Sequence, residues 1–379
     1  MRTLTLVAAG SGLPDREELL RRERADEMPR ASLYADTLGS DMLDERFLAA
    51  VPRARARVYR GIPTPAAQVM EAFIRMTGYD AVISWSEHLG IPLAGLLKAT
   101  GRRPVHVGLF SWISKPKKAM LLRRVHSRFD RIILWSSVQR DFAVNTLGIP
   151  ASRIAFTRYH VDQKFWRPLG GAPAEMICAA GREMRDYATL IEALRGTGIR
   201  GHIAAQPYPG KHDGWMSDLS SGELPPNVTV GARSPADLRR LYNSSRFTVI
   251  PLMETDTDNG VTCILESMAA GKPVICSRTK GQCDVVRDGE TGLYVTPGDP
   301  RALREAITFL WNHPQEAERM GRQARAYIER FHTFDWWTAE VRSIVEDAVQ
   351  EHRRALLSKR PAAHRKAQPS LNTRGGSAA

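Results

Sequence analysis

Short apolar runs with the length of buried strands alternate with amphipathic, helix-like segments along most of the chain. In the first half these runs are residues 3–9, 79–86, 104–110 and 130–137. Helices usually supply the crossover connections that parallel strands need, so this alternation predicts a parallel sheet covered by helices on both faces. We therefore expect the first half to form a Rossmann-like α/β domain.

The alternation stops over residues 153–175 and then begins again. Four Pro and Gly residues mark this break as a linker between domains, namely Pro168, Gly170, Gly171 and Pro173. Because 379 residues are more than one typical domain needs, two domains are expected. We place the first over residues 1–168 and the second, also Rossmann-like, over residues 169–332.

Residues 333–352 have the pattern of a last helix with one apolar face. That face contains Phe334, Trp337, Val341, Ile344, Val345 and Ala348, and we expect the helix to cross back and pack on the first domain. Residues 353–379 carry seven basic residues and no acidic one, out of a net charge of +13. We expect this tail to be disordered, either in contact with anionic lipid or nucleic acid or simply solvated.

Composition argues against several other classes of protein. No apolar run reaches the roughly 18 residues of a membrane span, and the apolar part of the N-terminus is short for a secretory signal. We expect a cytoplasmic protein, with peripheral contact at the inner membrane face as an open alternative. Its four cysteines show neither CxxC pairs nor the spacing of metal ligands, so neither a disulfide nor a zinc site is expected.

The stretch DTDNGVTCILESMAAGKPVI (256–275) predicts an anion site. It follows a strand and begins a helix near Val261, and a helix N-terminus at the carboxyl edge of a parallel sheet attracts anions. Gly260 would allow the backbone to approach a diphosphate, and Glu266 could accept both hydroxyls of a ribose. Taken singly, Asp258 fits a helix cap and Glu266 an exposed helix position at least as well.

The full string shifts the balance toward the ligand-binding interpretation. DNGVTCILESMAAGKPVI, followed by GQCDVVRDGETGLYVTPGDPRAL, closely resembles the signature of the retaining, GT-B fold glycosyltransferases of family 4 (glycosyl transferases group 1). GREMRDYATLIEAL (181–194) resembles the family's diphosphate-gripping segment, and HVDQKFWRP (160–168) resembles its linker. The resemblance is continuous from about Ser136 to Ala348 and weaker before that.

The resemblance implies a fold and an activity. Two Rossmann-like domains would face a cleft, the first binding the acceptor and the second the nucleotide sugar, with the last helix crossing back. The protein would be a hexosyltransferase (EC 2.4 class) that moves a sugar from a nucleotide diphosphate sugar to an acceptor hydroxyl with retention of anomeric configuration. The acceptor, whether a small molecule, a lipid-linked molecule or a glycan, stays open, and no nucleic acid partner is expected.

The resemblance also implies site residues. The catalytic set is Arg182, Arg185, Asp258 and His88; the donor-binding set is Asn259, Gly260, Val261, Thr262 and Glu266, with Gly10, Ser11 and Gly12 approaching the phosphate from the first domain. The chain also departs from the family pattern in several places, three of which bear on the site. Asp258 replaces a Glu, Arg185 stands where Lys is usual, and Phe110 stands where many relatives have a His that contacts the sugar. His88 or Ser111 would then serve in place of that His.

The charge of the diphosphate can be met without a metal ion. No Asp-x-Asp follows a strand outside the family motif, so we expect arginines and the helix N-terminus to do this, with no cofactor beyond the donor substrate. A basic cluster over 115–129 would bind an anionic acceptor or a membrane, or would only be solvated; its members are Lys115, Lys117, Lys118, Arg123, Arg124 and Arg128.

Other functions stay open to different degrees. A dinucleotide-dependent oxidoreductase is disfavoured, because no GxGxxG with an acidic residue about twenty positions later follows either first strand. A catalytically silent scaffold that binds nucleotide sugar or membrane, and a nucleotide-sugar epimerase, are the remaining alternatives.

Overall fold

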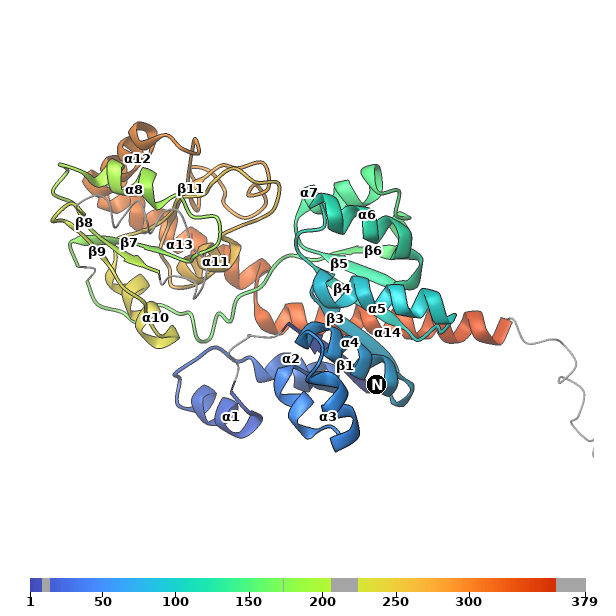
Figure 1. Cartoon of the computed structure of the whole chain (residues 1–379). Coiled ribbons are helices and arrows are strands. Elements are labelled where there is room, and N and C mark those ends of the chain that lie inside the picture. The colour runs from blue at the N-terminus through green and yellow to red at the C-terminus, as the bar shows by residue number, and fades with distance from the viewer. Residues whose placement is uncertain (9–13, 173, 206–223, 359–379) are drawn as a thin grey trace, which may run out of the picture.

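The computed structural model describes residues 1–8, 14–172, 174–205 and 224–358. It contains two parallel sheets of six strands, each covered by helices, in two domains that lie side by side (Figure 1). This confirms the predicted fold class of two Rossmann-like α/β domains. The predicted phosphate loop Gly10, Ser11 and Gly12 lies outside the described residues.

The first sheet has the strand order β2-β1-β3-β4-β5-β6. Its strands are β1 (Thr3–Val7), β2 (Ser40–Leu43), β3 (Ala81–Trp85), β4 (His106–Phe110), β5 (Arg131–Leu134) and β6 (Ile154–Phe156). Its helices are α1 (Arg16–Arg24), α2 (Ser32–Leu38), α3 (Arg53–Tyr59), α4 (Thr64–Arg75), α5 (Glu87–Thr100), α6 (Pro116–Val125) and α7 (Ser137–Asp141). The central strands β3, β4 and β5 are almost entirely buried, as their apolar runs predict.

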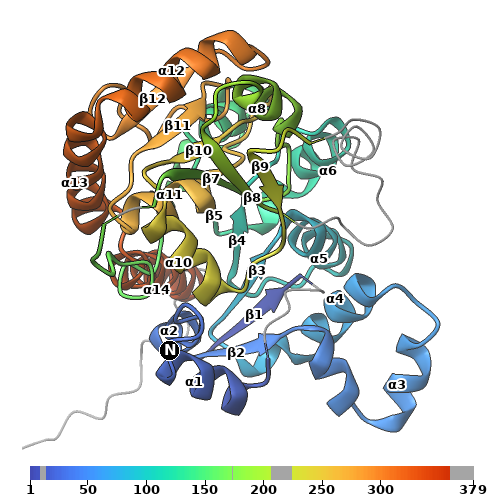
Figure 2. The same ribbon diagram turned by 90° about the vertical axis from the view of Figure 1, so that its left-hand side faces the viewer.

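The second sheet has the order β12-β11-β10-β7-β8-β9. Its strands are β7 (Met176–Ala180), β8 (Arg200–Ala204), β9 (Val228–Val230), β10 (Thr248–Ile250), β11 (Val274–Ser277) and β12 (Gly292–Val295). The helices are α8 (Tyr187–Leu194), α10 (Pro235–Ser244), α11 (Val261–Ala269), α12 (Pro300–Asn312) and α13 (Pro314–Phe331). In Figure 2 the helices α12 and α13 lie along the outer side of this domain, and Figure 1 shows α11 on the side nearer the first domain.

Helix α14 (Phe334–Ser358) returns to the first domain. Phe334, Trp337, Val341, Val345 and Ala348 are buried in one cluster with residues of the first sheet, and Ile344 is partly buried against it. The helix continues beyond its predicted end at residue 352, so the tail assigned to residues 353–379 is helical in its first part. Arg353 extends the packing by forming an ion pair with Asp80 at 2.6 Å. Residues 359–379 lie outside the described residues.

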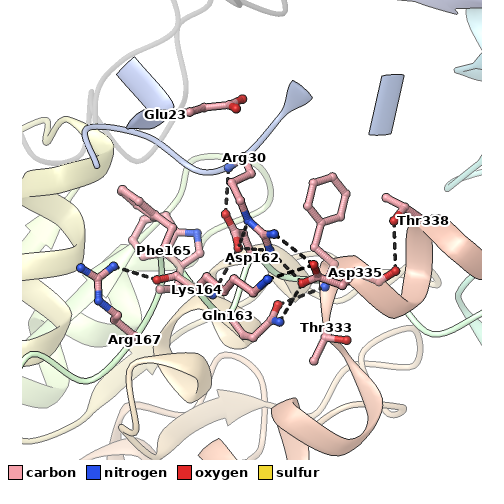
Figure 3. Close-up of polar contacts among 12 residues, drawn as sticks. Glu23, Arg30, Asp162, Gln163, Lys164, Phe165, Arg167, Thr333, Asp335 and Thr338 are labelled. Carbon is pink, nitrogen blue, oxygen red and sulfur yellow. Dashed lines mark hydrogen bonds and ion pairs between the residues drawn. The ribbon is translucent and has the colours of Figure 1, made fainter. Parts of the chain in front are cut away.

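An ion-pair cluster joins the linker to the segment between α1 and α2 and to the start of α14 (Figure 3). The guanidinium of Arg30, between α1 and α2, donates to Asp162 in the linker at 2.7 and 3.0 Å and to Asp335 at the start of α14 at 2.8 and 3.0 Å. The carboxylate of Asp162 is almost fully buried. This three-residue cluster, the hinge cluster, fixes the two crossing segments relative to the first domain.

Within the described residues, no helix has both the length and the apolar character that crossing a bilayer requires.

Candidate active site

A cavity of about 460 Å³ lies between the carboxyl edges of the two sheets. The first domain lines it with residues that follow β3, β4 and β5, and the second domain with residues after β7 and β10. Those most relevant to chemistry are Glu87, Ser111, Trp112, Arg182, Arg185, Asp258, Asn259, Gly260, Val261 and Thr262. The carboxyl ends of parallel strands are where α/β proteins bind their ligands.

The N-terminus of α11 points at this cavity. Its cap is Gly260, whose φ of 87° is in the left-handed region that glycine adopts without strain. A Cβ on Gly260 would lie 3.0 Å from a side-chain carbon of Ile250, so glycine also lets the loop pack closely on β10. The helix therefore begins directly at the cavity, where its N–H groups and dipole favour an anion.

Two arginines from the loop after β7 add positive charge. Arg182 is exposed to the cavity, whereas Arg185 is 4% exposed. The guanidinium of Arg185 donates to the carbonyl oxygens of Ala180 at 2.9 Å and Glu183 at 2.6 Å, and lies 3.6 Å from the sulfur of Cys263. All three partners are neutral, so the charge of this buried arginine is available to an anion in the cavity.

Glycine at position 181 makes the place of Arg185 possible. Gly181 has φ of 98°, and a Cβ there would lie 2.2–2.9 Å from three atoms of the Arg185 guanidinium. Any other residue would displace the arginine as well as strain the backbone. Gly181 in the sequence GREMR therefore leaves the space that the guanidinium of Arg185 occupies.

Asp258 is a buried acid at the cavity wall, with 6% exposure. Its Oδ1 lies 3.3 Å from the hydroxyl oxygen of Thr257, and its buried Oδ2 has no partner among the described residues. Burial raises the pKa of Asp258 to about 7. A buried carboxyl oxygen without a partner is costly, and a ligand hydroxyl would relieve that cost.

Glu266 does not line this cavity but an adjoining one. It lines a second space of about 540 Å³ that shares Trp85, Tyr159 and Thr262 with the first. Its Oε2 accepts from the buried hydroxyl of Tyr242 at 3.0 Å, and burial raises the pKa of Glu266 to about 8. Arg182 and Glu266 thus face two adjoining spaces on the same side of the second domain.

The first domain presents a braced loop, residues 111–114, after β4. Glu87, at the start of α5, accepts the backbone N–H groups of Ser111 at 2.8 Å and Trp112 at 2.6 Å with one oxygen. Gln139, on α7, accepts the next two N–H groups of the same loop at 2.9 and 3.2 Å. The side chains of Glu87 and Gln139 are both buried, and together they accept hydrogen bonds from four consecutive backbone N–H groups. Burial strengthens such bonds and fixes the loop. The sequence analysis missed Glu87 and Gln139.

This loop bonds to the second domain. The indole N–H of Trp112 donates to Asp256 at 3.0 Å, and the hydroxyl of Thr257 donates to the carbonyl of Ser111 at 3.2 Å. The amide of Gln139 donates to the backbone carbonyl of Asp256 at 2.6 Å. Two sequence-distant loops therefore meet at the cavity, where the loop before α11 and the first domain are joined.

The structure explains the departure at position 110. The ring of Phe110 is fully buried, and a Cβ on either Gly90 or Gly108 would come within 2.7 Å of it. Phe110 thus points into the core, and Ser111 and Trp112 reach the cavity in its place. His88 is exposed on the first turn of α5 and is not among the residues that line the cavity, because its neighbour Glu87 points inward.

The predicted basic cluster is divided by the length of α6. At the cavity end, the ammonium of Lys115 lies 3.7 Å from the ring centroid of Trp112, and that of Lys118 lies 3.2 Å from Glu87. At the other end, Arg123 bonds to the carbonyl of Thr146, and Arg124 is exposed. Lys117 is exposed on the first turn. The cluster is therefore two groups of residues in different surroundings.

Part of the second domain is similar to a known family. Residues 216–327 match the family model described as Glycosyl transferases group 1. The D-rhamnosyltransferase WbpZ of Pseudomonas aeruginosa is 45% identical over 71 residues, which cover 18% of this chain and 19% of that protein. The glycogen synthase of Mycobacterium tuberculosis is 26% identical over 278 residues, covering 68% and 63%. The chain thus spans less than two thirds of the length of either relative.

Solved structures resemble the whole chain. The sucrose-phosphate synthase from Thermosynechococcus elongatus superposes with a TM-score of 0.70 at 17% identity, covering 95% of this chain and 100% of that one. Anabaena HepE in complex with UDP-glucose gives a TM-score of 0.64 at 17% identity, covering 94% and 100%. The chain therefore has the GT-B fold expected from its sequence, and its second domain is similar to the glycosyl transferases group 1.

Proposed function

We propose that the protein is a retaining glycosyltransferase (EC 2.4 class) that moves a sugar from a nucleotide diphosphate sugar to an acceptor hydroxyl without a metal ion. One observation carries the proposal. Arg182, the buried Arg185, the N-terminus of α11 and the unpartnered carboxyl oxygen of Asp258 all line one cavity between two nucleotide-binding folds. The two arginines can bind a diphosphate, and the carboxyl oxygen of Asp258 can accept a hydrogen bond from a sugar hydroxyl. Together they suit a molecule in which a diphosphate is joined to a sugar.

The roles follow the positions. Arg182, Arg185 and the first N–H groups of α11 would hold the diphosphate, with Asn259 to Thr262 as its backbone cradle. Asp258 would accept a sugar hydroxyl through its free oxygen, and Glu266 the ribose hydroxyls in the adjoining space. The relatives support this choice of donor, because two of them are named as a rhamnosyltransferase and a glycogen synthase and HepE was solved with UDP-glucose.

Catalysis would be mainly electrostatic. As the bond between the sugar and the diphosphate breaks, negative charge grows on the departing oxygen, and prearranged cations stabilise it without reorganisation. The acceptor hydroxyl would attack from the same face, which retains the configuration. The bonds between the loops at 111–114 and 256–257 would keep water out of the closed cavity.

Product analysis tests this proposal. Purified protein is incubated with a panel of nucleotide diphosphate sugars in excess EDTA, and release of nucleoside diphosphate is measured with and without candidate acceptors. We expect turnover of at least one donor in EDTA, a transferred sugar of unchanged anomeric configuration by NMR, and a large loss of turnover in Arg182→Ala. Arg195→Ala, which removes an exposed arginine from the end of α8, is the control. Inversion, or dependence on added Mg²⁺, would contradict the mechanism.

A further inference from the structure

A basic face lies at the amino edge of the first sheet, on the side away from the cavity. It consists of seven residues around the short 3-10 helix His126–Arg128, namely Lys98, Arg102, Arg103, Arg123, Arg124, Arg128 and Arg153. These residues lie at the C-terminal end of α5, at the C-terminal end of α6 and before β4, β5 and β6. Strands of four or five residues span roughly 15 Å, so the basic face and the cavity occupy opposite edges of one sheet.

The charges of the basic face are not neutralised. Lys98 bonds to the carbonyl of Arg124 at 2.7 Å, Arg103 to that of Ser127 at 2.8 Å, and Arg128 to that of Arg102 at 3.5 Å. In the part of the chain that the structure describes, none of the seven forms an ion pair. The carboxylates nearby have other contacts: Asp80 pairs with Arg353 and Glu351 with Arg131. Asp130 accepts the backbone N–H of His106 at 2.9 Å and lies 3.5 Å from a ring nitrogen of His352.

The positive charges affect the pKa of a partly buried histidine, His126. His126 lies in the middle of the basic face, and its pKa is lowered by burial and then by the charges of Arg153 and Lys98. Repulsion among like charges destabilises a folded protein unless something compensates it. The concentration of unpaired cations therefore indicates an anionic partner.

Exposed aliphatic side chains accompany these charges. Met120 is 48% exposed on α6, one turn before Arg123 and Arg124. Leu356 and Leu357 are 57% and 65% exposed on the last turn of α14. Figure 1 shows α14 projecting beyond the first sheet at this end. Aliphatic residues interspersed with arginines fit an interface between headgroups and acyl chains.

The end of α14 adjoins the basic face. A groove of about 430 Å³ is lined by Arg102 and Arg103 on one side and by His352 and Arg353 on the other. The sequence then continues from Ser358 with Lys359 and Arg360. The C-terminal part of α14 and the basic face therefore meet at this groove.

We propose that this face binds the surface of an anionic lipid bilayer, with the leucines of α14 entering the headgroup region and the cavity opening toward solution. Lipid suits the face better than single-stranded nucleic acid, because the exposed apolar residues beside the charges are aliphatic, whereas nucleic acid binding would use aromatic side chains for base stacking. An acceptor would then reach the cavity from the aqueous side. This proposal is independent of the catalytic one.

Sedimentation with vesicles tests the proposal. The full chain is mixed with vesicles of phosphatidylcholine alone or with added phosphatidylglycerol, at low and high salt. We expect binding only to the anionic vesicles, weakened by salt. Combining Arg102→Gln, Arg103→Gln, Arg123→Gln and Arg124→Gln should weaken binding at least about tenfold. Leu356→Ser with Leu357→Ser should weaken it without any change in charge.

The matched control changes the net charge equally on the other domain. It combines Arg195→Gln, Arg240→Gln, Arg301→Gln and Arg322→Gln, all exposed, and should bind vesicles as the wild type does. Equal losses in both quadruple variants would overturn the proposal. So would complete loss of binding in a chain that ends at Ser358, since the tail alone would then be the contact. Binding to a single-stranded oligonucleotide but not to vesicles would also overturn it.

Discussion

The indole N–H of Trp112, in the first domain, donates to the carboxylate of Asp256, in the second, at 3.0 Å. Glu87 holds the backbone N–H of the same tryptophan at 2.6 Å, and Lys115 lies over its ring. Trp112 therefore connects the core of the first domain to the loop that precedes Asp258. The two domains are coupled at the wall of the cavity as well as at the linker.

Replacing Trp112 by Phe should weaken the contact between the two domains without weakening donor binding. The variant keeps an aromatic ring but loses the bond to Asp256, worth about 1 kcal/mol, so we expect turnover to fall about fivefold while donor affinity changes less than twofold. Turnover and calorimetric titration of the donor measure the two effects. Trp336→Phe, at an exposed site on α14, is the control. A parallel loss of affinity would mean that Trp112 contacts the donor directly.

Gly181→Ala should lower the free energy of unfolding by more than the left-handed backbone conformation alone would explain. At Gly196, where φ is 74° and nothing lies within 4 Å of the place that a methyl group would take, alanine should cost about 1–2 kcal/mol of unfolding free energy. At Gly181 the added methyl also displaces the Arg185 guanidinium, so we expect a greater loss of stability together with loss of donor binding. Urea unfolding and donor titration of both variants provide the comparison. Equal behaviour of the two variants would contradict the predicted coupling to Arg185.

Asp258→Asn should change how stability depends on pH. Because burial raises the pKa of Asp258 to about 7, the folded state keeps a proton that the unfolded chain releases at the ordinary carboxyl pKa. Between these two values the wild type therefore loses stability as pH rises. Relative to wild type, the variant should gain on the order of 2–3 kcal/mol from pH 5 to pH 8, measured by urea unfolding. A constant difference across this range would contradict the raised pKa.

Arg30→Met should destabilise the protein through the hinge cluster. The change leaves the buried carboxylate of Asp162 and its neighbour Asp335 without their main cation, which we expect to cost about 3–5 kcal/mol. Arg30 also holds the pKa of Asp335 well below its usual range, so the wild-type advantage should shrink as pH falls toward and below that range. Chemical unfolding at several pH values measures both effects. Arg301→Met, at an exposed helix pair, should cost less than about 0.5 kcal/mol.

The sequence predicts the sheets well because their central strands are continuous apolar runs. It gives no sign of β2, whose residues Ser40–Leu43 form an edge strand with only Leu43 fully buried. The sequence also places the end of α14 too early, because a basic stretch resembles a tail when its ion pair with Asp80 cannot be seen. A continuous run of apolar residues predicts a strand that is buried on both faces. The pairing of an edge strand and the ion pairs of the surface depend on residues that are distant in sequence.

The site can be predicted only unevenly for a similar reason. The residues after β7 and β10 lie on contiguous motifs, so Arg182, Arg185 and Asp258 can be named from the string alone. Glu87 and Gln139 act by accepting backbone N–H groups of a loop distant in sequence, and no motif signals that role. Burial of Glu87 beside an exposed His88 depends on the direction in which α5 begins, which only the three-dimensional structure gives.

The central claim is that one nucleotide diphosphate sugar is held at once by Arg182 and Glu266. Calorimetric titration in EDTA, with the donor that most stabilises the wild type, tests it most directly. We predict that Glu266→Ala weakens binding of that donor by about 2–3 kcal/mol and that Arg182→Ala also weakens it. The nucleoside alone should lose affinity only in Glu266→Ala. Unchanged donor binding in either variant would contradict the claim.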